Sequence, residues 1–440
     1  MDTENTTKSS SSMLPDYAKA ILVGAHVKGA HPLLPLNESL DELAQLAATV
    51  EVMEIGRLTQ QVGHIEPATF IGSGKVEELV ELVRDTGAGT VIFDDELSPR
   101  HQRELAERLG ENVKLLDRSA LILDIFARHA RTREGALQVE LAQYEYRLPR
   151  LTRQWTHLSR QVGGGARGGA GGVGVRGPGE TQLEVDRREI SRRIIHLKDD
   201  IEKVRQQRLI QRQQRRKAGI PVISLLGYTN AGKSTLLKAL SGADIYIADK
   251  LFATLDPTTR RVSLPSGRQV LVTDTVGFIQ KLPTTLIAAF RATLEEITEA
   301  DVILHVVDTS HPNVSAHIEA VEDILAEMDV PEDLTRVLVW NKIDRWGDQP
   351  LPHSPESHDV EVKISAETGE GVDDLLHVLE DIASTTLLRV TLLIPYNRGD
   401  ILSQLHDSAR VIETESIEEG SRIEVEIPRR LVDRFESYRV

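Results

Sequence analysis

The 440-residue chain has no cysteine, so disulfide bonds, thiolate catalysis and cysteine-ligated zinc or iron–sulfur centres are excluded. It also has no apolar run near the roughly 18 residues of a membrane-spanning helix. Its first residues are polar and show no hydrophobic signal core. We therefore expect a cytoplasmic protein without stable membrane insertion. Apolar (40%) and charged (27%) contents are ordinary for a globular protein, which excludes wholesale disorder.

The charge is acidic overall but unevenly distributed. The formal net charge is −16, yet residues 147–217 carry 18 Lys and Arg against 7 Asp and Glu. A soluble acidic protein with one arginine-rich stretch can bind a polyanion at that stretch. The 14 histidines show no metal-binding spacing, so we expect them to be surface or core residues.

The pattern of apolar and polar residues predicts an α/β protein of several domains. We expect a disordered tail at 1–13 and an N-terminal parallel α/β domain at 14–135, where β-branched runs alternate with helical patterns. A long helical hairpin is expected at 136–218. Alternating strands and helices return at 219–387, and a small α+β C-terminal domain is expected at 388–440.

The expected hairpin rests on two apolar stripes with spacings of three and four residues. The first stripe runs over residues 137–162 and predicts a long helix with a kink at Pro149. The second runs over residues 183–204. Between them, segment 163–179 contains ten glycines in seventeen residues, which is typical of a flexible loop. The alternative is a solvated coiled-coil face followed by a plain linker.

A phosphate-binding loop is predicted where an apolar strand meets a helical run. Gly227-x4-Gly232-Lys233-Ser234 has the required spacing, with glycines that let backbone N–H groups converge on a phosphate. Lys233 would bridge β- and γ-phosphate oxygens, and Ser234 would bind Mg²⁺. The alternative is a chance glycine-rich turn. The nucleotide contacts expected here are Gly227, Tyr228, Thr229, Asn230, Ala231, Gly232, Lys233, Ser234 and Thr235.

Two further segments are predicted to sense the γ-phosphate. Thr254, favoured over Thr258 and Thr259, would act through the magnesium ion. Asp274 follows an apolar strand and would hold the metal through water, while the backbone N–H of Gly277 would reach the γ-phosphate. We expect Lys233, Thr254 and Gly277 to be catalytic, and Ser234 and Thr254 to bind the metal. The nucleotide contacts expected here are Phe252, Ala253, Thr254, Leu255, Asp256, Asp274, Thr275, Val276 and Gly277.

Base selection is predicted at the ends of two later strands. In Asn341-Lys342-Ile343-Asp344, the Asp344 carboxylate can accept hydrogen bonds from guanine N1–H and the exocyclic amine, for which adenine has no equivalents. Ile364 is followed by residues that would supply a backbone N–H near guanine O6. The expected guanine contacts are Asn341, Lys342, Ile343, Asp344, Ser365, Ala366 and Glu367. Segment 219–387 is therefore expected to be a P-loop GTPase domain, a mixed sheet flanked by helices, that hydrolyses GTP to GDP and phosphate.

Two residues bear on how the attacking water is activated. Phe278 follows Gly277, where Ras-like GTPases place a water-orienting glutamine. Asn230 stands where potassium-dependent GTPases supply a monovalent-cation ligand, so we hypothesise that K⁺, together with an RNA surface, replaces the glutamine. The alternative is that Asn230 only caps local backbone.

A second stretch, Gly72-Ser73-Gly74-Lys75, resembles a phosphate loop only superficially. It lacks the first glycine of the spacing and the terminal Ser or Thr. We therefore regard an ATP site there as the lesser alternative.

Several longer stretches together resemble the HflX family, in the Obg–HflX branch of translational GTPases. They are FIGSGKVEEL, VELAQYEYRLPRL, RGPGETQLEVDRREI, GYTNAGKST, LFATLDPTTR, DTVGFI and NKID. The resemblance spans nearly the whole chain. It implies GTP and GDP binding, association with the large ribosomal subunit, ribosome splitting in some lineages, and a role in stress rescue or assembly. It also implies that the hairpin and its glycine-rich loop point into rRNA near the peptidyl-transferase centre.

The residues of the loop agree with an RNA partner. Segment 163–179 contains Arg167 and Arg176 and no acidic residue, so we expect both arginines to contact RNA phosphates. Off the ribosome we expect a monomer. Two other functions remain open: a steric anti-association factor with a slow GTPase, and a signalling GTPase directed at a protein.

Overall fold

The computed structural model describes residues 18–30, 32–151, 182–217, 220–243, 251–282, 297–298, 300–328, 330, 334–347, 350–351, 358–428, 432 and 434–440. The expected tail 1–13 and segment 163–179, with Arg167 and Arg176, lie outside the described residues. Contacts within the chain divide it into two compact units, residues 1–125 and 126–440. In the described part of the chain, no helix is long and apolar enough to cross a membrane.

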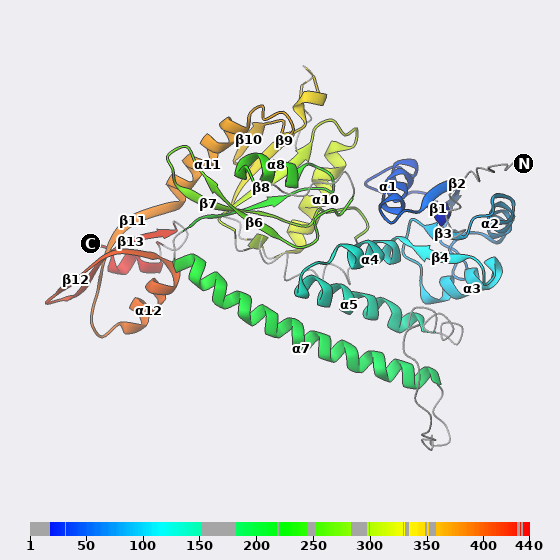
Figure 1. Cartoon of the computed structure of the whole chain (residues 1–440), viewed down its shortest axis with the longest axis horizontal. Coiled ribbons are helices and arrows are strands. Elements are labelled where there is room, and N and C mark those ends of the chain that lie inside the picture. The colour runs from blue at the N-terminus through cyan, green and yellow to red at the C-terminus, as the bar shows by residue number, and fades with distance from the viewer. Residues whose placement is uncertain are drawn as a thin grey trace, which may run out of the picture. The chain divides into compact units, whose positions relative to one another are not determined.

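The first unit contains a four-stranded parallel sheet, as predicted (Figure 1). Strands and helices alternate: β1 (Lys19–Val27), α1 (Leu36–Thr49), β2 (Met53–Val62), α2 (Ser73–Thr86), β3 (Thr90–Phe93), α3 (Pro99–Leu109) and β4 (Lys114–Asp117). The strand order is β2-β1-β3-β4. One core cluster joins β1 and β3 to α2 and α3 through buried side chains such as Ile21, Val91, Leu79 and Leu105. Helix α4 (Arg118–His129) follows and crosses the boundary between the units.

The second unit is built around a six-stranded mixed sheet of order β10-β9-β8-β5-β7-β6. Its strands are β5 (Val222–Leu226), β6 (Thr258–Ser263), β7 (Gln269–Asp274), β8 (Val302–Asp308), β9 (Thr335–Asn341) and β10 (Val360–Lys363). Only β6 pairs antiparallel, with β7. In the described part of this sheet region, α8 (Lys233–Ser241), α10 (Val314–Glu327) and α11 (Val372–Thr386) pack against the strands. β5 pairs in parallel with β7 on one side and with β8 on the other. The chain segments that follow these strands therefore leave toward opposite sides at the carboxyl end of β5, which is where ligands bind in such sheets.

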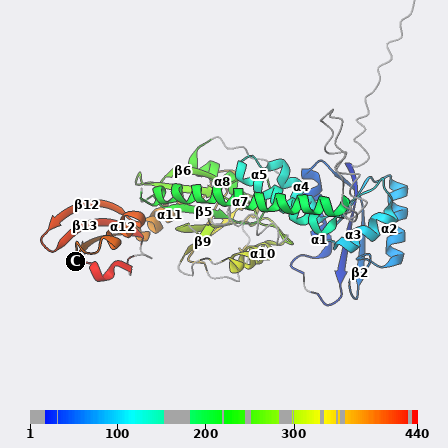
Figure 2. The same ribbon diagram turned by 90° about the horizontal axis from the view of Figure 1, so that it is seen from below.

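The helical hairpin consists of α5 (Arg133–Arg147), which lies beside α7 (Gln182–Lys217), the long green helix of Figures 1 and 2. At 36 residues, α7 is about 54 Å long. The predicted apolar stripes meet in a cluster made of Leu137, Leu141, Tyr144 and Leu148 with Ile190, Ile194, Leu197 and Ile201. The expected helix does not continue through Pro149 as an α-helix: α5 ends at Arg147, and Leu148–Arg150 form a 3-10 turn. Pro149 has no backbone N–H to continue the α-helical hydrogen bonding, and its ring crowds the preceding turn, which explains this end. The rest of the first expected stripe, residues 152–162, lies outside the described residues.

The end of the chain forms the predicted small α+β element. It comprises β11 (Leu387–Ile394), α12 (Gly399–Ser408), β12 (Arg410–Ile417) and β13 (Gly420–Pro428) in an antiparallel sheet of order β11-β13-β12. Residues 429–431 and 433 lie outside the described residues, and the last regular element is a 3-10 turn at Glu436–Tyr438.

Candidate nucleotide site

The loop between β5 and α8 has a backbone that only glycine fits at two positions. Gly227 has φ of 151°, and a Cβ there would collide with the carbonyl oxygen of Val306 on β8. Gly232 has φ of 97°, and a Cβ there would collide with the amide of Asn341. Glycine is the residue that tolerates both a positive φ and so close an approach. The predicted phosphate loop is thus wound tightly against β8 and β9.

Lys233 begins α8 and is buried within its own loop. Its Nζ donates hydrogen bonds to the carbonyl oxygens of Gly227 (3.0 Å) and Tyr228 (2.7 Å). Burial lowers the pKa of Lys233 to about 8, against the opposing influence of the Asp274 charge. Burial likewise raises the pKa of the Asp274 carboxyl. Both groups have lost hydration of their charged forms, and an anionic phosphate beside Lys233 would restore the stability of its ammonium form.

Three oxygen-bearing side chains meet beside Lys233. Ser234 Oγ lies 2.6 Å from Asp274 Oδ2 and 2.9 Å from Thr254 Oγ1. The other Asp274 oxygen, Oδ1, is buried and makes no hydrogen bond within the described residues. Hydroxyl and carboxylate oxygens are the ligands that Mg²⁺ prefers. The residues present therefore fit a magnesium ion that Ser234 and Thr254 would bind directly. Asp274, which accepts a hydrogen bond from Ser234, would bind the ion through water.

The choice of Thr254 among three threonines agrees with this arrangement. Thr258 and Thr259 lie on β6, and their hydroxyls are directed elsewhere. Thr258 Oγ1 lies 3.5 Å from the carbonyl oxygen of Asp256, and Thr259 Oγ1 lies 3.0 Å from Thr273 Oγ1.

The segment after β7 packs against the phosphate loop. A Cβ on Gly277 would stand 2.9 Å from both Lys233 Nζ and Thr229 Cα, so the glycine permits close approach. The backbone of Phe278 bonds to the loop, donating to Gly227 (3.1 Å) and accepting from Thr229 (2.7 Å). The Phe278 side chain is buried. A buried aromatic side chain has no carboxamide with which to orient a water molecule.

Asn341 connects the phosphate loop to the base-recognition segments. Its buried amide donates to the carbonyl of Ala231 (2.8 Å), and its Oδ1 accepts the backbone N–H of Ala366 (2.9 Å). Lys342 has φ of 63°, and its Nζ donates to the Asn230 carbonyl (2.9 Å) and to Asp308 Oδ2 (2.7 Å). The expected guanine-binding segments are therefore joined to the phosphate loop by side chains of β9 and its following turn.

The expected acceptor for guanine lies on an exposed turn. Asp344 is in the 3-10 turn Ile343–Arg345, and Glu367 is also exposed. The N–H groups of Ser365 and Ala366 already donate within the protein, to Glu370 and Asn341 respectively. In this arrangement they are not the N–H group expected near guanine O6.

Two residues expected at the nucleotide are placed elsewhere. Phe252 is buried, and its ring contacts that of Phe126. The Asp256 carboxylate accepts hydrogen bonds from the backbone of Arg131 and Thr132. Sequence reasoning missed both contacts because the partners are more than 120 residues apart in the chain. The glycine φ pattern of the phosphate loop is also absent at Gly72, whose φ is −61°; there Lys75 pairs with Glu78.

The parallel strands of this mixed sheet end in the phosphate loop, in Asp274 and in the turn that holds Asp344, and Thr254 lies beside Ser234. This arrangement defines a P-loop GTPase.

Comparisons with known proteins extend this class to a family. Four family models match in order: "GTP-binding GTPase N-terminal" (37–127), "GTP-binding GTPase Middle Region" (129–215), "50S ribosome-binding GTPase" (222–342) and "HflX C-terminal domain" (352–436). GTPase HflX of Caldanaerobacter subterraneus subsp. tengcongensis is 45% identical, over 91% of this chain and 90% of its own. GTPase HflX of Escherichia coli K12 is 44% identical, over 90% and 91%. The chain belongs to the HflX family of GTPases and is a GTP hydrolase.

Among solved structures, a GTP-binding protein from the archaeon Sulfolobus solfataricus in complex with GDP is 22% identical. It aligns over 83% of this chain and 98% of its own, with a TM-score of 0.43.

Proposed function

We propose that this GTPase acts on the large ribosomal subunit and its rRNA, where GTP hydrolysis sets how long it stays bound. The tasks that fit are ribosome splitting, rescue and assembly. The description "50S ribosome-binding GTPase" of the matching family model supports the partner. The observation that carries the proposal is a direct connection between the predicted switch segment and the helical hairpin.

The connection begins two residues after Thr254. Asp256 accepts the backbone N–H groups of Arg131 and Thr132, both at 2.8 Å, and the hydroxyl of Thr132. Thr132 is the N-cap of α5, and its side chain also accepts the N–H of Gly135. A carboxylate at a helix N-terminus is favoured by the unpaired N–H groups and the helix dipole. The segment that contains Thr254 is therefore bound to the start of α5.

A second contact lies on the other side of Thr254. The rings of Phe252 and Phe126 meet edge to face, with centroids 4.6 Å apart. Such a pair contributes about 0.5–1.5 kcal/mol beyond its buried area. Thr254 lies between Phe252 and Asp256, which are both held by these contacts. A movement of Thr254 therefore disturbs contacts with the end of α4 and with the start of α5.

The hairpin presents basic side chains that suit an RNA. Glu134 at the start of α5 pairs with Arg208 of α7 at 2.7 Å, and Glu140 pairs with Arg193 at 2.8 Å. Nearer the start of α7, Arg187, Arg188 and Arg192 are exposed. Arginine side chains on an extended helix can contact successive phosphates, and this contribution weakens as salt rises. We include Arg167 and Arg176 in this proposed surface.

The residues of the site define the steps of the cycle. Lys233 exchanges its two carbonyl acceptors for phosphate oxygens, while Thr254 and the N–H of Gly277 engage the γ-phosphate. Mg²⁺ held by Ser234 and Thr254 would neutralise charge on the phosphates. Loss of the γ-phosphate removes what holds Thr254 and Gly277, so segment 251–256 relaxes and changes its contacts with α5. Because Phe278 cannot orient water, we propose that K⁺ near Asn230 and the rRNA surface contribute to its activation.

The connection can be broken without touching a nucleotide motif. A methyl group at Gly135 would collide with the Asp256 carboxylate, although alanine is the better helix former. For Gly135→Ala we expect basal turnover within about twofold of wild type, with the stimulation by large subunits reduced roughly tenfold, as loss of about 1.4 kcal/mol of coupling implies. The matched control is Gly74→Ala, in the first turn of α2, where a Cβ would meet nothing within 4 Å.

Phosphate release with and without purified subunits measures both effects. Full stimulation of Gly135→Ala by large subunits would contradict the connection.

Co-sedimentation with separated subunits, in GDP and in a non-hydrolysable GTP analogue, tests the ribosomal partner and the timing of its release. Equal binding in both nucleotides would contradict the timer. Deleting 163–179 should abolish stimulation but preserve basal turnover; a steric wedge would lose its anti-association effect with no change in turnover.

A further inference from the structure

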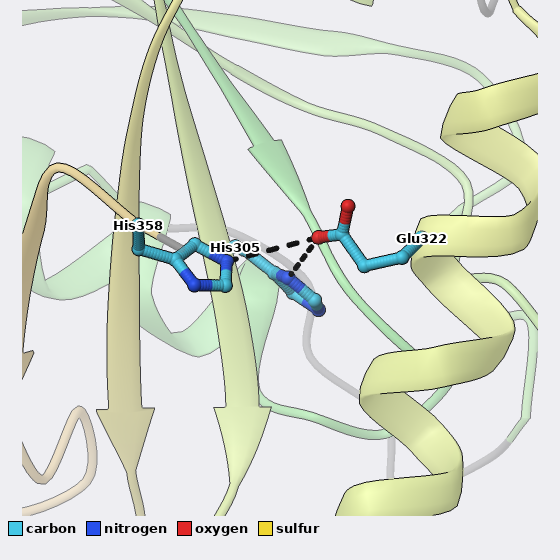
Figure 3. A group of neighbouring side chains, drawn as sticks. All are labelled: His305, Glu322 and His358. Atoms are coloured by element: carbon cyan, nitrogen blue, oxygen red, sulfur yellow. Dashed lines mark ion pairs between the residues drawn. The ribbon is translucent and has the colours of Figure 1, made fainter. Parts of the chain in front are cut away.

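Three side chains that the nucleotide site does not use converge between the sheet and α10. His305 lies on β8, Glu322 on α10 and His358 two residues before β10. In Figure 3 both imidazoles and the carboxylate point toward one another. The side chains of His305 and His358 are 2% and 1% exposed, and that of Glu322 is 11% exposed. We call these three residues the His–Glu–His cluster.

The spacing of the donor atoms is wider than hydrogen bonding requires. Glu322 Oε1 lies 3.3 Å from His305 Nδ1 and 3.7 Å from His358 Nε2. A typical N–H···O bond is about 2.9–3.0 Å. Neither His305 Nδ1 nor Glu322 Oε1 makes a hydrogen bond within the described residues. The two atoms form an ion pair without a hydrogen bond, an arrangement that fits a group bound by both of them.

A metal ion accounts for that spacing. Ligand bonds of about 2.0–2.1 Å at tetrahedral angles place donor atoms about 3.4 Å apart. Two of the donor separations, 3.3 Å and 3.7 Å, are close to that spacing, and all three donors lie within 4.8 Å of one another. Two imidazoles and one carboxylate suit a borderline transition-metal ion, whereas Mg²⁺ prefers oxygen ligands alone.

The other oxygen of the carboxylate has its own partner. Arg336 on β9 donates to Glu322 Oε2 at 3.1 Å, which orients the carboxylate and leaves Oε1 facing the imidazoles. Partners of this kind commonly hold metal ligands in place.

We propose that His305 Nδ1, His358 Nε2 and Glu322 Oε1 bind one zinc-class divalent cation, with a water molecule as the fourth ligand. The ion would cross-link β8, α10 and the segment before β10, which are far apart in sequence. Its role is structural: it stabilises the face of the sheet opposite α8 and α11. The site is separate from the proposed magnesium site and independent of the ribosomal partner.

The test uses the untagged full chain, saturated with Mg²⁺ and GDP so that the nucleotide site is filled. Titration with Zn²⁺, read by calorimetry and by metal analysis after gel filtration, should give one tightly bound equivalent and a higher Tm. Co²⁺ in its place should show the visible absorption bands of a tetrahedral site. Glu322→Gln keeps the size of the side chain and should weaken zinc binding more than tenfold. Glu319→Gln, an exposed residue one turn away on α10, is the matched control and should bind normally.

His358→Gln provides a second variant outside the regular strands, in case the loss of Glu322 lowers solubility. It should also lose zinc binding and the absorption of Co²⁺. Wild-type protein that binds no zinc under these conditions, or zinc binding unchanged in both variants, would overturn the proposal. The cluster would then be a buried ion-pair network anchored by Arg336.

Discussion

Two glycine–lysine turns stand at the starts of helices in this chain, and they differ in backbone conformation. Before α8, Gly232 has φ of 97° and Lys233 is buried with its Nζ on carbonyls of its own loop. Before α2, Gly72 has φ of −61°, and Lys75 pairs with Glu78 at 2.8 Å. Both helices have unpaired N–H groups at their starts. The difference shows that a phosphate loop needs a backbone wound back around its lysine, and not merely glycine and lysine before a helix.

The largest expected difference between the two turns follows from replacing the lysine of each by alanine. Lys233→Ala loses a charged contact to phosphate that contributes about 1.5–3 kcal/mol, so GTP affinity should fall roughly 10- to 150-fold and turnover should be nearly abolished. Lys75→Ala should remain within about twofold of wild type. Binding of a fluorescent GTP analogue and phosphate release measure the two effects. A comparable loss of nucleotide binding in Lys75→Ala would reveal a second phosphate site in the first unit.

A substitution in the turn expected to recognise the base, rather than in the phosphate loop, sharpens the comparison. Asp344→Asn replaces an acceptor with an amide that mismatches guanine N1–H, which should weaken GTP binding by about 2–3 kcal/mol, or roughly 30- to 150-fold. Xanthosine triphosphate, which carries a carbonyl where guanine has its amine, should bind the variant better than it binds wild type. Competition assays with both nucleotides measure this exchange. Unchanged GTP preference would show that Asp344 does not select the base.

The burial of Lys233 also predicts a pH dependence. Its pKa of about 8 means that the ammonium form, which phosphate requires, dominates below pH 8 and is lost above it. GTP affinity should therefore be level below pH 8 and fall by up to about tenfold per pH unit above it. Calorimetry between pH 7 and 9 measures both affinity and proton uptake. The Lys233→Arg variant stays charged throughout, so its affinity for GTP should not change over this pH range. A GTP affinity of the wild type that does not change between pH 7 and 9 would contradict the prediction.

The smallest expected effect concerns the monovalent cation. Asn230 has φ of 60°, a conformation that glycine also adopts, so Asn230→Gly removes the carboxamide without straining the loop. We expect wild-type turnover to be a few-fold faster in K⁺ than in Na⁺, and the variant to show no difference. Equal turnover of wild type in the two salts would leave Asn230 with a local backbone role alone.

Most of the nucleotide site could be predicted because each motif is local. Gly227 and Gly232 follow β5, Asp274 ends β7 and Asn341 ends β9, and their spacings are those that a strand-to-loop transition itself requires. The hairpin stripe was also predictable, since residues three and four apart share one helix face. The end of α5 at Arg147 was missed, although Pro149 signalled it, because the apolar spacing continues past the proline.

Other contacts left no local signal. Asp256 lies inside a nucleotide motif, yet its carboxylate binds the start of α5, and nothing near it in sequence announces that partner. His305, Glu322 and His358 follow no metal-binding spacing, since they come from a strand, a helix and a loop. Their meeting depends on the order of β8, β9 and β10 in the sheet.

The amino-acid order alone determined the chemistry of the GTPase loops, the alternation of strands and helices, and the apolar seam of the hairpin. Each depends on residues a few positions apart, whose relative placement follows from backbone geometry. Only the tertiary structure decided where Asp256 and Phe252 attach and which histidines share a carboxylate. Those contacts depend on how distant segments pack, and packing is set by the whole core rather than by any one stretch of chain.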